Sequence, residues 1–250
     1  MSIADEWRGI YAACFTPLTS DEQLDEDAFE RAARALIGEG QRGLYVCGST
    51  GEGYALADDV RCAAFRVAAR IGRELNARII AHVGSVPTRR AAAMARAAAE
   101  CGCDSVAAIP PAGGRYSYVE LTDYYTRLGQ ATALPLLVYH IPELSGYDFS
   151  RDELSRWLGL PNVAGIKFSS YDMYKLERLI ALHTDKMFFH GADPMLMHGL
   201  AVGATGAIGS TYNLAGSIAI QIFESVRRND IAAARRMQAT LNTFIEVMHH

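Results

Sequence analysis

One lysine of this chain stands where a lysine can do covalent chemistry. Lys167 ends the apolar run 163–166, two small hydroxyl residues follow at Ser169 and Ser170, and the next acidic residue is Asp172. A lysine in a buried strand must be paired with an acid or lose its proton, because burial disfavours the charged amine. A neutral amine attacks carbonyl carbons and forms a Schiff base. The alternative is a structural ion pair inside the fold, and Lys167 alone does not decide between the two.

A glycine-rich run, GSTGEG at 48–53, directly follows another apolar segment. Such a loop can direct successive backbone N–H groups and the hydroxyls of Ser49 and Thr50 at one anion. It lacks the Gly-Lys-Ser/Thr ending of a Walker loop, so a small carboxylate suits it better than a triphosphate. The alternative is a tight turn whose glycines are needed for positive φ.

Tyr139 ends the apolar run that precedes the one containing Lys167. If the two runs are neighbouring strands, its hydroxyl reaches the Lys167 amine, where a tyrosine beside a cationic imine can transfer protons. The alternative is a packed core tyrosine. His140 points to the opposite side of the strand and is expected to be structural.

Eight short apolar runs must position these residues. They lie at 9–15, 43–48, 78–84, 105–110, 135–142, 163–170, 186–193 and 203–210. The runs are continuously hydrophobic, as in parallel strands covered on both faces. Helix-like segments follow them, with Asp58, Thr88 and Ser150 as expected N-caps. This alternation predicts an α/β fold, a (β/α)8 barrel, which places catalytic groups at the C-terminal ends of its strands.

The chain shows no linker-like composition. We expect the catalytic barrel over residues 1–213 and helices packed on it over 214–250, which together form a short C-terminal helical extension.

Composition excludes several classes of function. The net charge of −4 over 250 residues gives no basic surface for nucleic acid. The five cysteines have no zinc-site spacing and are interpreted as reduced thiols, and the N-terminus has no signal-peptide pattern, so a cytoplasmic protein without a metal is expected. The uncharged stretch 194–223 contains GATGAIGSTYN, which interrupts it too strongly for a membrane span.

Four segments carry a family resemblance over nearly the whole chain: YVCGSTGEGYAL, LLVYHIPELSG, VAGIKFSSYDMYKLERL and GLAVGATGAIGSTYNL. In this order and spacing they resemble the dihydrodipicolinate synthase and N-acetylneuraminate lyase superfamily of class I pyruvate aldolases. The stretches KFSSYDMYKLER and GAIGSTYN are most similar to the N-acetylneuraminate lyases.

The resemblance implies that Lys167 forms an imine with pyruvate or another 2-keto acid, without a separate cofactor. It makes Tyr139 the acid/base residue at the cleaved bond and implies a second substrate, an aldehyde or sugar. It also implies a homo-oligomer, a tetramer or a dimer. The implied substrate-binding residues are Ser49, Thr50 and Gly51 for the carboxylate and Ser169, Gly191, Asp193 and Ser210 for the rest of the substrate.

Three features depart from the family pattern. The lyases carry Asp-Glu where this chain has Asp193-Pro194, so an acid that would hold the distal glycerol tail of sialic acid is missing. The strand-four loop reads Pro-Pro-Ala-Gly-Gly at 110–114, with Tyr116 and Tyr118 out of register with the tyrosine of relatives. The C-terminal helices are fewer than usual, so the oligomer is expected to differ or the chain to be shortened.

Three functions are compatible with these features. The leading one is an N-acetylneuraminate lyase-like Schiff-base lyase or aldolase that joins pyruvate and an aldehyde or separates them. The second, favoured by Pro194, is an aldolase or dehydratase for shorter 2-keto-3-deoxy sugar acids. The third, motivated by the altered strand-four loop, is a weakly active regulatory or binding protein on the same scaffold.

Overall fold

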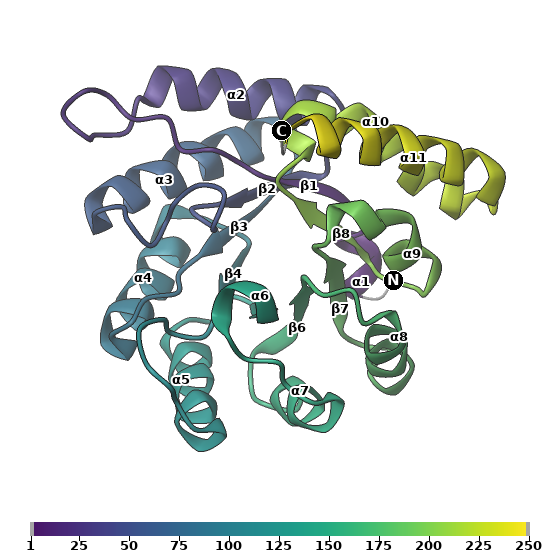
Figure 1. The fold of residues 1–250 in the computed structure, drawn as a ribbon. Coiled ribbons are helices and arrows are strands. Elements are labelled where there is room, and N and C mark those ends of the chain that lie inside the picture. Colours follow the sequence, from purple (N-terminus) through teal and green to yellow (C-terminus); the bar gives the residue numbers. More distant parts are fainter. Residues whose placement is uncertain (1–2, 249–250) are drawn as a thin grey trace.

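The computed structural model describes residues 3–248 and confirms the (β/α)8 barrel. Within this range eight parallel strands close in chain order into one barrel (Figure 1). The strands are β1 (Gly9–Ala13), β2 (Gly43–Val46), β3 (Arg78–His82), β4 (Ser105–Ala108), β5 (Leu136–His140), β6 (Val163–Phe168), β7 (Met187–His190) and β8 (Gly206–Gly209).

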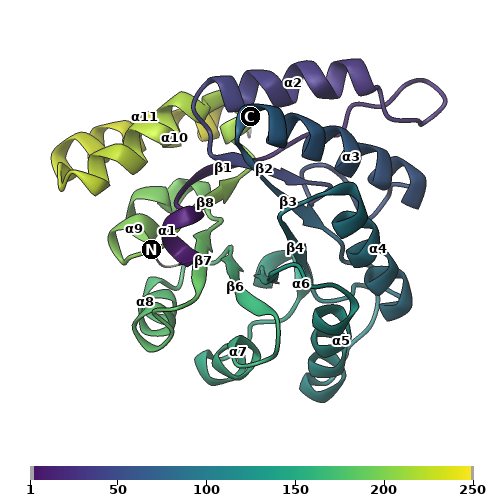
Figure 2. The same ribbon diagram turned by 180° about the vertical axis from the view of Figure 1, so that it is seen from behind.

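Helices surround the barrel in both views (Figures 1 and 2). They are α1 (Ile3–Glu6), α2 (Glu26–Gly38), α3 (Asp58–Leu75), α4 (Thr88–Cys101), α5 (Tyr118–Ala131), α6 (Pro142–Ser145), α7 (Arg151–Leu158), α8 (Met173–Leu182), the 3₁₀ turn η1 (Asp193–Met195), α9 (Leu196–Ala201), α10 (Tyr212–Arg227) and α11 (Ile231–Met248). None of the helices between residues 3 and 248 is long and apolar enough to cross a membrane.

Helix starts agree only in part with the expected caps. Ser150 caps α7 in a capping box with Glu153. Asp58 and Thr88 are instead the first helical residues of α3 and α4, and the residues before them hold the cap positions without a side-chain hydrogen bond. Those two expectations were wrong by one residue, since the helices begin one residue early on an extended backbone.

Two apolar layers follow from the alternation of side chains along each strand. Outward side chains pack under the helices in the larger core, whereas inward ones fill the barrel with aromatic rings. The rings of Tyr11 and Phe189, for example, meet edge to face with centroids 5.2 Å apart. In the register of β5 and β6, Tyr139 is the direct partner of Lys167, so both side chains point into the same end of the barrel.

The two C-terminal helices lie together at one side of the ring (Figures 1 and 2). α10 packs on β1, and α11 packs on α10 and also contacts η1. The division of the chain after residue 213 stays a prediction, and residues 249 and 250 of the expected second segment lie outside the described residues.

Three buried histidines end strands β3, β5 and β7: His82, His140 and His190. Burial lowers the pKa of His82 to about 3 and the pKa of each of the other two to about 4. The three imidazoles are therefore neutral in the folded protein down to a pH well below the value of roughly 6.5 at which an unfolded histidine takes up a proton.

We expect the free energy of unfolding to have its full value above about pH 6.5 and to fall as the pH decreases toward about 4. In that range the unfolded chain binds more protons than the folded chain, and each histidine contributes a slope of up to about 1.4 kcal/mol per pH unit. Urea unfolding between about pH 7 and about pH 5 measures the slope. His140→Phe keeps a ring against Phe149 and Phe168. This variant should have a smaller pH slope of the unfolding free energy, because the contribution of about one proton is lost. Equal slopes in the two proteins would contradict this origin.

Candidate active site

The chain contains three lysines, Lys167, Lys175 and Lys186. Lys175 Nζ lies 2.7 Å from Asp148 Oδ1, and Lys186 Nζ donates a hydrogen bond of 2.8 Å to the carbonyl oxygen of Val163. Lys167 is only 4% exposed, yet its amine forms no hydrogen bond or salt bridge with any residue in the described range 3–248. A structural ion pair is thus present at Lys175 and not at Lys167.

Aromatic faces, rather than a carboxylate, surround the Lys167 amine. Nζ lies 3.9 Å from the ring centroid of Tyr139 and 4.3 Å from that of Tyr45. Such contacts stabilise a cation by about 0.5–2 kcal/mol, less than a buried carboxylate would. Tyr139 is 3% exposed and meets Tyr45 edge to face, with centroids 6.1 Å apart. The lysine and the tyrosine that the sequence singled out therefore lie together.

The sequence analysis singled out neither Tyr45 nor His82. Tyr45 is fully buried, its hydroxyl has no hydrogen-bond partner among residues 3–248, and burial raises its pKa well above the ordinary value. His82 Nε2 accepts from the Ile109 N–H at 3.2 Å, so Nδ1 carries the proton and donates to the Cys47 carbonyl oxygen at 3.2 Å. Both groups are uncharged and face Tyr139. The only signal in the sequence was the period of two along β2 and β3.

The loop after β2 brings Ser49, Thr50 and Gly51 to the same end of the barrel. Gly53 N–H donates to the Gly48 carbonyl oxygen at 3.0 Å, which closes the turn. No hydrogen bond within residues 3–248 uses the hydroxyl of Ser49 or Thr50, so both remain available to a ligand.

Close packing, and not positive φ, explains the glycines of this loop. The left-handed residues are Cys47 and Glu52, with φ of 56° and 51°. A Cβ on Gly53 would lie 1.8 Å from the Cys47 carbonyl oxygen, and one on Gly51 would lie 2.8 Å from that of Cys14. The alternative that the glycines serve only a positive-φ turn is therefore wrong.

Ser169, Gly191, Asp193 and Ser210 line one pocket of about 210 Å³ at the ends of β6, β7 and β8. A Cβ on Gly191 would lie 2.0 Å from Ser169 Oγ and 3.3 Å from Lys167 Cε, so residue 191 must be small and these three residues are neighbours. Ser169 Oγ is buried and has no partner among the described residues. The other lining residues are Ile141, Glu143, Tyr171, Ala192, Pro194, Thr211 and Ile245.

Asp193 is buried, and one of its two carboxylate oxygens is hydrogen-bonded inside the protein. Its Oδ2 accepts from the Thr211 N–H at 3.0 Å and from the Thr211 hydroxyl at 2.8 Å. Burial raises its pKa, and the charge of Lys167 offsets part of that effect. The other oxygen, Oδ1, lies against Gly209 beside the buried Tyr212 hydroxyl. Asp193 therefore joins the ends of β7 and β8 in addition to lining the pocket.

The last helix holds this wall of the site in place. Gln238 on α11 donates to the Asp193 carbonyl oxygen at 3.1 Å and accepts from the Met197 N–H at 2.8 Å. Ile245, about two turns further along α11, lines the pocket itself. No local motif marks Gln238, because its partners lie 45 and 41 residues away in the chain.

A second pocket, of about 370 Å³ and mostly apolar, lies toward β2, β3 and β4. Ser49 and His82 line it together with Pro110, Pro111 and Ala112 of the strand-four loop. Lys167 and Tyr139 are buried beside the two pockets: Gly191 of the smaller one is a neighbour of Lys167, and the His82 ring of the larger one faces Tyr139. No group of three or more His, Cys, Asp or Glu side chains in the described part of the chain is arranged to hold a metal ion.

Tyr147 fixes the strand-four loop, for which the sequence offered no anchor. Its hydroxyl donates to the Gly114 carbonyl oxygen at 3.1 Å and accepts from the Tyr116 N–H at 2.5 Å. Tyr118 instead stacks on Trp157, with ring centroids 5.1 Å apart, and is structural.

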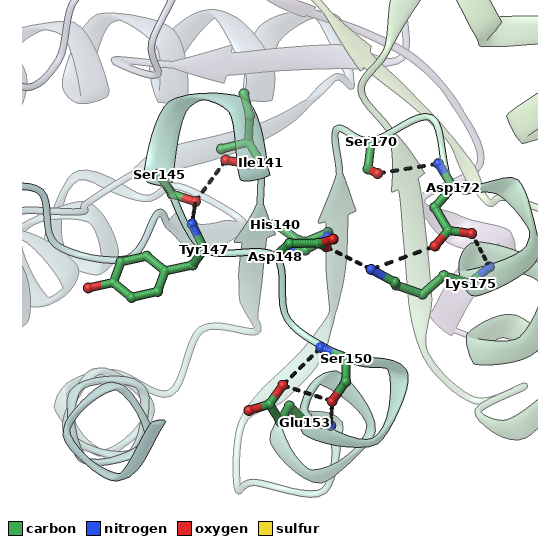
Figure 3. A network of polar contacts seen from close by, with 10 residues as sticks. All are labelled: His140, Ile141, Ser145, Tyr147, Asp148, Ser150, Glu153, Ser170, Asp172 and Lys175. Carbon is green, nitrogen blue, oxygen red and sulfur yellow. Dashed lines mark hydrogen bonds and ion pairs between the residues drawn. The ribbon is translucent and has the colours of Figure 1, made fainter. Parts of the chain in front are cut away.

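Figure 3 shows how the loops after β5 and β6 are joined. Lys175 lies between Asp148 and Asp172, with Nζ 2.7 Å from Asp148 Oδ1 and 3.7 Å from Asp172 Oδ2. His140, whose side chain overlaps that of Asp148 in this view, has Nε2 3.7 Å from Asp148 Oδ1. Its ring packs on Phe149 and Phe168, on the side of the strand away from Tyr139. His140 is thus outside the group around Lys167, as the period of two predicted.

Comparison with known proteins points to one family. The Dihydrodipicolinate synthetase family matches residues 6–250. The N-acetylneuraminate lyase of Salmonella typhimurium is 35% identical over 247 residues, which cover 98% of this chain and 83% of the relative. The structure of CdNal from Clostridium difficile in complex with mannosamine has a TM-score of 0.92 and 32% identity, covering 96% of this chain and 82% of that one. YagE, a prophage protein from E. coli K12 solved in complex with pyruvate, has a TM-score of 0.90 and 25% identity over 96% and 82% of the two chains.

These comparisons confirm the resemblance carried by the four motifs, and with it the prediction that the protein is an enzyme of a pyruvate-dependent lyase and aldolase family. The match spans the barrel and both C-terminal helices. The chain belongs to the dihydrodipicolinate synthetase family.

Proposed function

We propose that this protein is a class I lyase or aldolase in which Lys167 forms a Schiff base with a 2-keto acid, in the manner of N-acetylneuraminate lyase. The observation that carries the proposal is that Lys167 alone of the three lysines has no partner in the described structure and faces Tyr139 at the catalytic end of the barrel. The relationship to an N-acetylneuraminate lyase, and to YagE solved with pyruvate, supports the same chemistry.

In the cleavage direction, the neutral Lys167 amine adds to the keto carbon. The hydroxyl of the adduct then takes the proton of Tyr139 and leaves as water, which gives a cationic imine and leaves Tyr139 as a phenolate. Tyr139 accepts the proton of the hydroxyl next to the bond that breaks, the aldehyde departs, and the bonding electrons pass into the imine as an enamine. Protonation of the enamine carbon and hydrolysis release pyruvate and free the lysine. The imine itself serves as the electron sink, so this reaction calls on no separate cofactor.

The remaining predicted residues fit distinct parts of such a substrate. Ser49, Thr50 and Gly51 would bind the carboxylate, because two free hydroxyls and a turn of backbone N–H groups suit a small anion. On the other side of Lys167, a pocket with several hydroxyl groups suits a hydroxylated chain. The residues proposed to line the sugar part are Ser169, Gly191, Asp193 and Ser210.

A second candidate, an aldolase or dehydratase for shorter 2-keto-3-deoxy sugar acids, is favoured by Pro194, which offers this pocket no side-chain acceptor. We also propose a cytoplasmic homo-oligomer. All five cysteines are free thiols, and the exposed apolar residues Phe15, Tyr54 and Val86 support a further protein contact.

Three lysines allow a complete test of the nucleophile. Pyruvate with sodium borohydride should label Lys167 irreversibly, as peptide mass mapping would measure. Lys167→Arg should abolish labelling, because a guanidinium stays protonated and forms no imine. Lys175→Arg and Lys186→Arg are matched controls that keep the charge and should label normally. Label that persists in Lys167→Arg would overturn the mechanism.

Two tyrosines face the same amine, so a matched pair of variants can assign the proton transfer. Tyr139→Phe should lower kcat by roughly two to four orders of magnitude and weaken pyruvate trapping much less. Tyr45→Phe removes a hydroxyl that has no partner in the described structure and keeps the ring over Lys167, so kcat should fall by less than about tenfold. Steady-state kinetics distinguish the two. A larger loss of kcat in Tyr45→Phe than in Tyr139→Phe would assign the acid/base role to Tyr45.

A further inference from the structure

The pocket beside Lys167 receives a carboxylate from an element that the family pattern does not point to. Glu143, on the short helix α6, lines the same pocket as Ser169 and Gly191, the neighbours of Lys167. Its side chain is exposed and forms no hydrogen bond or ion pair with any residue between 3 and 248. Its carboxylate is therefore available to a ligand.

The helix that carries Glu143 is held firmly at its C-terminal side. Ser145 Oγ donates to the Ile141 carbonyl oxygen at 2.8 Å and accepts from the Tyr147 N–H at 3.2 Å (Figure 3). Tyr147 in turn fixes the strand-four loop, and Asp148 is bound to Lys175. In Figures 1 and 2, α6 lies over the inside of the ring of strands. The backbone position of Glu143 is thus determined by contacts that do not use its carboxylate.

Among the lining residues of this pocket, Glu143 carries the one carboxylate that is exposed and has both oxygens free of hydrogen bonds to residues 3–248. Of the two carboxylates in the lining, Asp193 is buried and binds Thr211 through Oδ2. Pro194 has no polar side chain. The lining contains no lysine or arginine, so nothing there neutralises Glu143 or would attract a phosphate. A carboxylate in such surroundings favours neutral hydroxyl groups and repels a second anion.

We propose that Glu143 sets the substrate preference of this enzyme by accepting hydrogen bonds from hydroxyls on the distal part of a long, uncharged polyhydroxylated chain, whose keto carbon lies at Lys167. The inference rests on the Schiff-base function proposed above. It names the substrate class as extended, non-phosphorylated 2-keto sugar acids. It also places a distal carboxylate in the loop after β5, instead of at the position of Pro194.

The test compares kcat/KM for N-acetylneuraminate with that for a six-carbon 2-keto-3-deoxy sugar acid. Glu143→Ala should lower kcat/KM for N-acetylneuraminate by about ten- to a hundredfold, because hydrogen bonds to a charged acceptor are lost. The value for the six-carbon acid should change by less than about threefold, since its chain ends nearer Lys167. Glu143→Gln should give an intermediate loss. Glu100→Gln, the same change at an exposed position on α4, is the control and should alter neither value.

Borohydride trapping of pyruvate, measured on the same proteins, separates this inference from the function on which it rests. Trapping in every protein together with a selective loss for the long substrate supports the role of Glu143. Trapping with an unchanged ratio between the two substrates overturns that role and leaves the Schiff base in place. The role of Glu143 is also overturned if the parent protein traps pyruvate but cleaves N-acetylneuraminate no faster than the six-carbon acid. A parent protein that does not trap pyruvate overturns both.

Discussion

The constraint on which the rest of this barrel end depends is a buried lysine, Lys167, whose amine has no hydrogen-bond or ion-pair partner among residues 3–248. Removing an ammonium group from water costs several kcal/mol, and the faces of Tyr45 and Tyr139 return only about 0.5–2 kcal/mol of that. Among residues 3–248 no carboxylate lies within ion-pair distance of this amine. In the reaction proposed above, a 2-keto acid brings a carboxylate of its own close to this amine.

His82 and Tyr45, which pack against Tyr139, add no charge to the site. His82 is held as one neutral tautomer by Cys47 and Ile109, and burial keeps the Tyr45 hydroxyl protonated. The negative charge of Asp193 is directed at Thr211. The Ser49 and Thr50 hydroxyls follow β2, whereas Ser169 follows β6 and lies against Gly191 at the end of β7. This separation gives the two ends of a keto acid different surroundings.

Sequence reasoning succeeded where the information is local. Runs of apolar residues predict strands, and a polar residue that ends such a run is placed at the catalytic end of a barrel, which is how Lys167 and Tyr139 were found. It failed where chemistry depends on segments far apart in the chain. Tyr45 looks like any core tyrosine until β2 is placed across the barrel from β6. Glu143 and Gln238 look like surface residues until the loop after β5 and the last helix meet the same pocket.

The sequence separation between the reactive residues and α11 has a consequence for the synthesis of the protein. A ribosome makes Lys167, Tyr139 and the loop after β2 well before it makes α11. A nascent chain can therefore possess every reactive group of the site while one wall of the pocket is missing, because Gln238 has not yet joined Asp193 and Met197 and Ile245 is not in place. The nucleophile is therefore synthesised before the cavity is complete, and this wall of the pocket forms only when α11 docks.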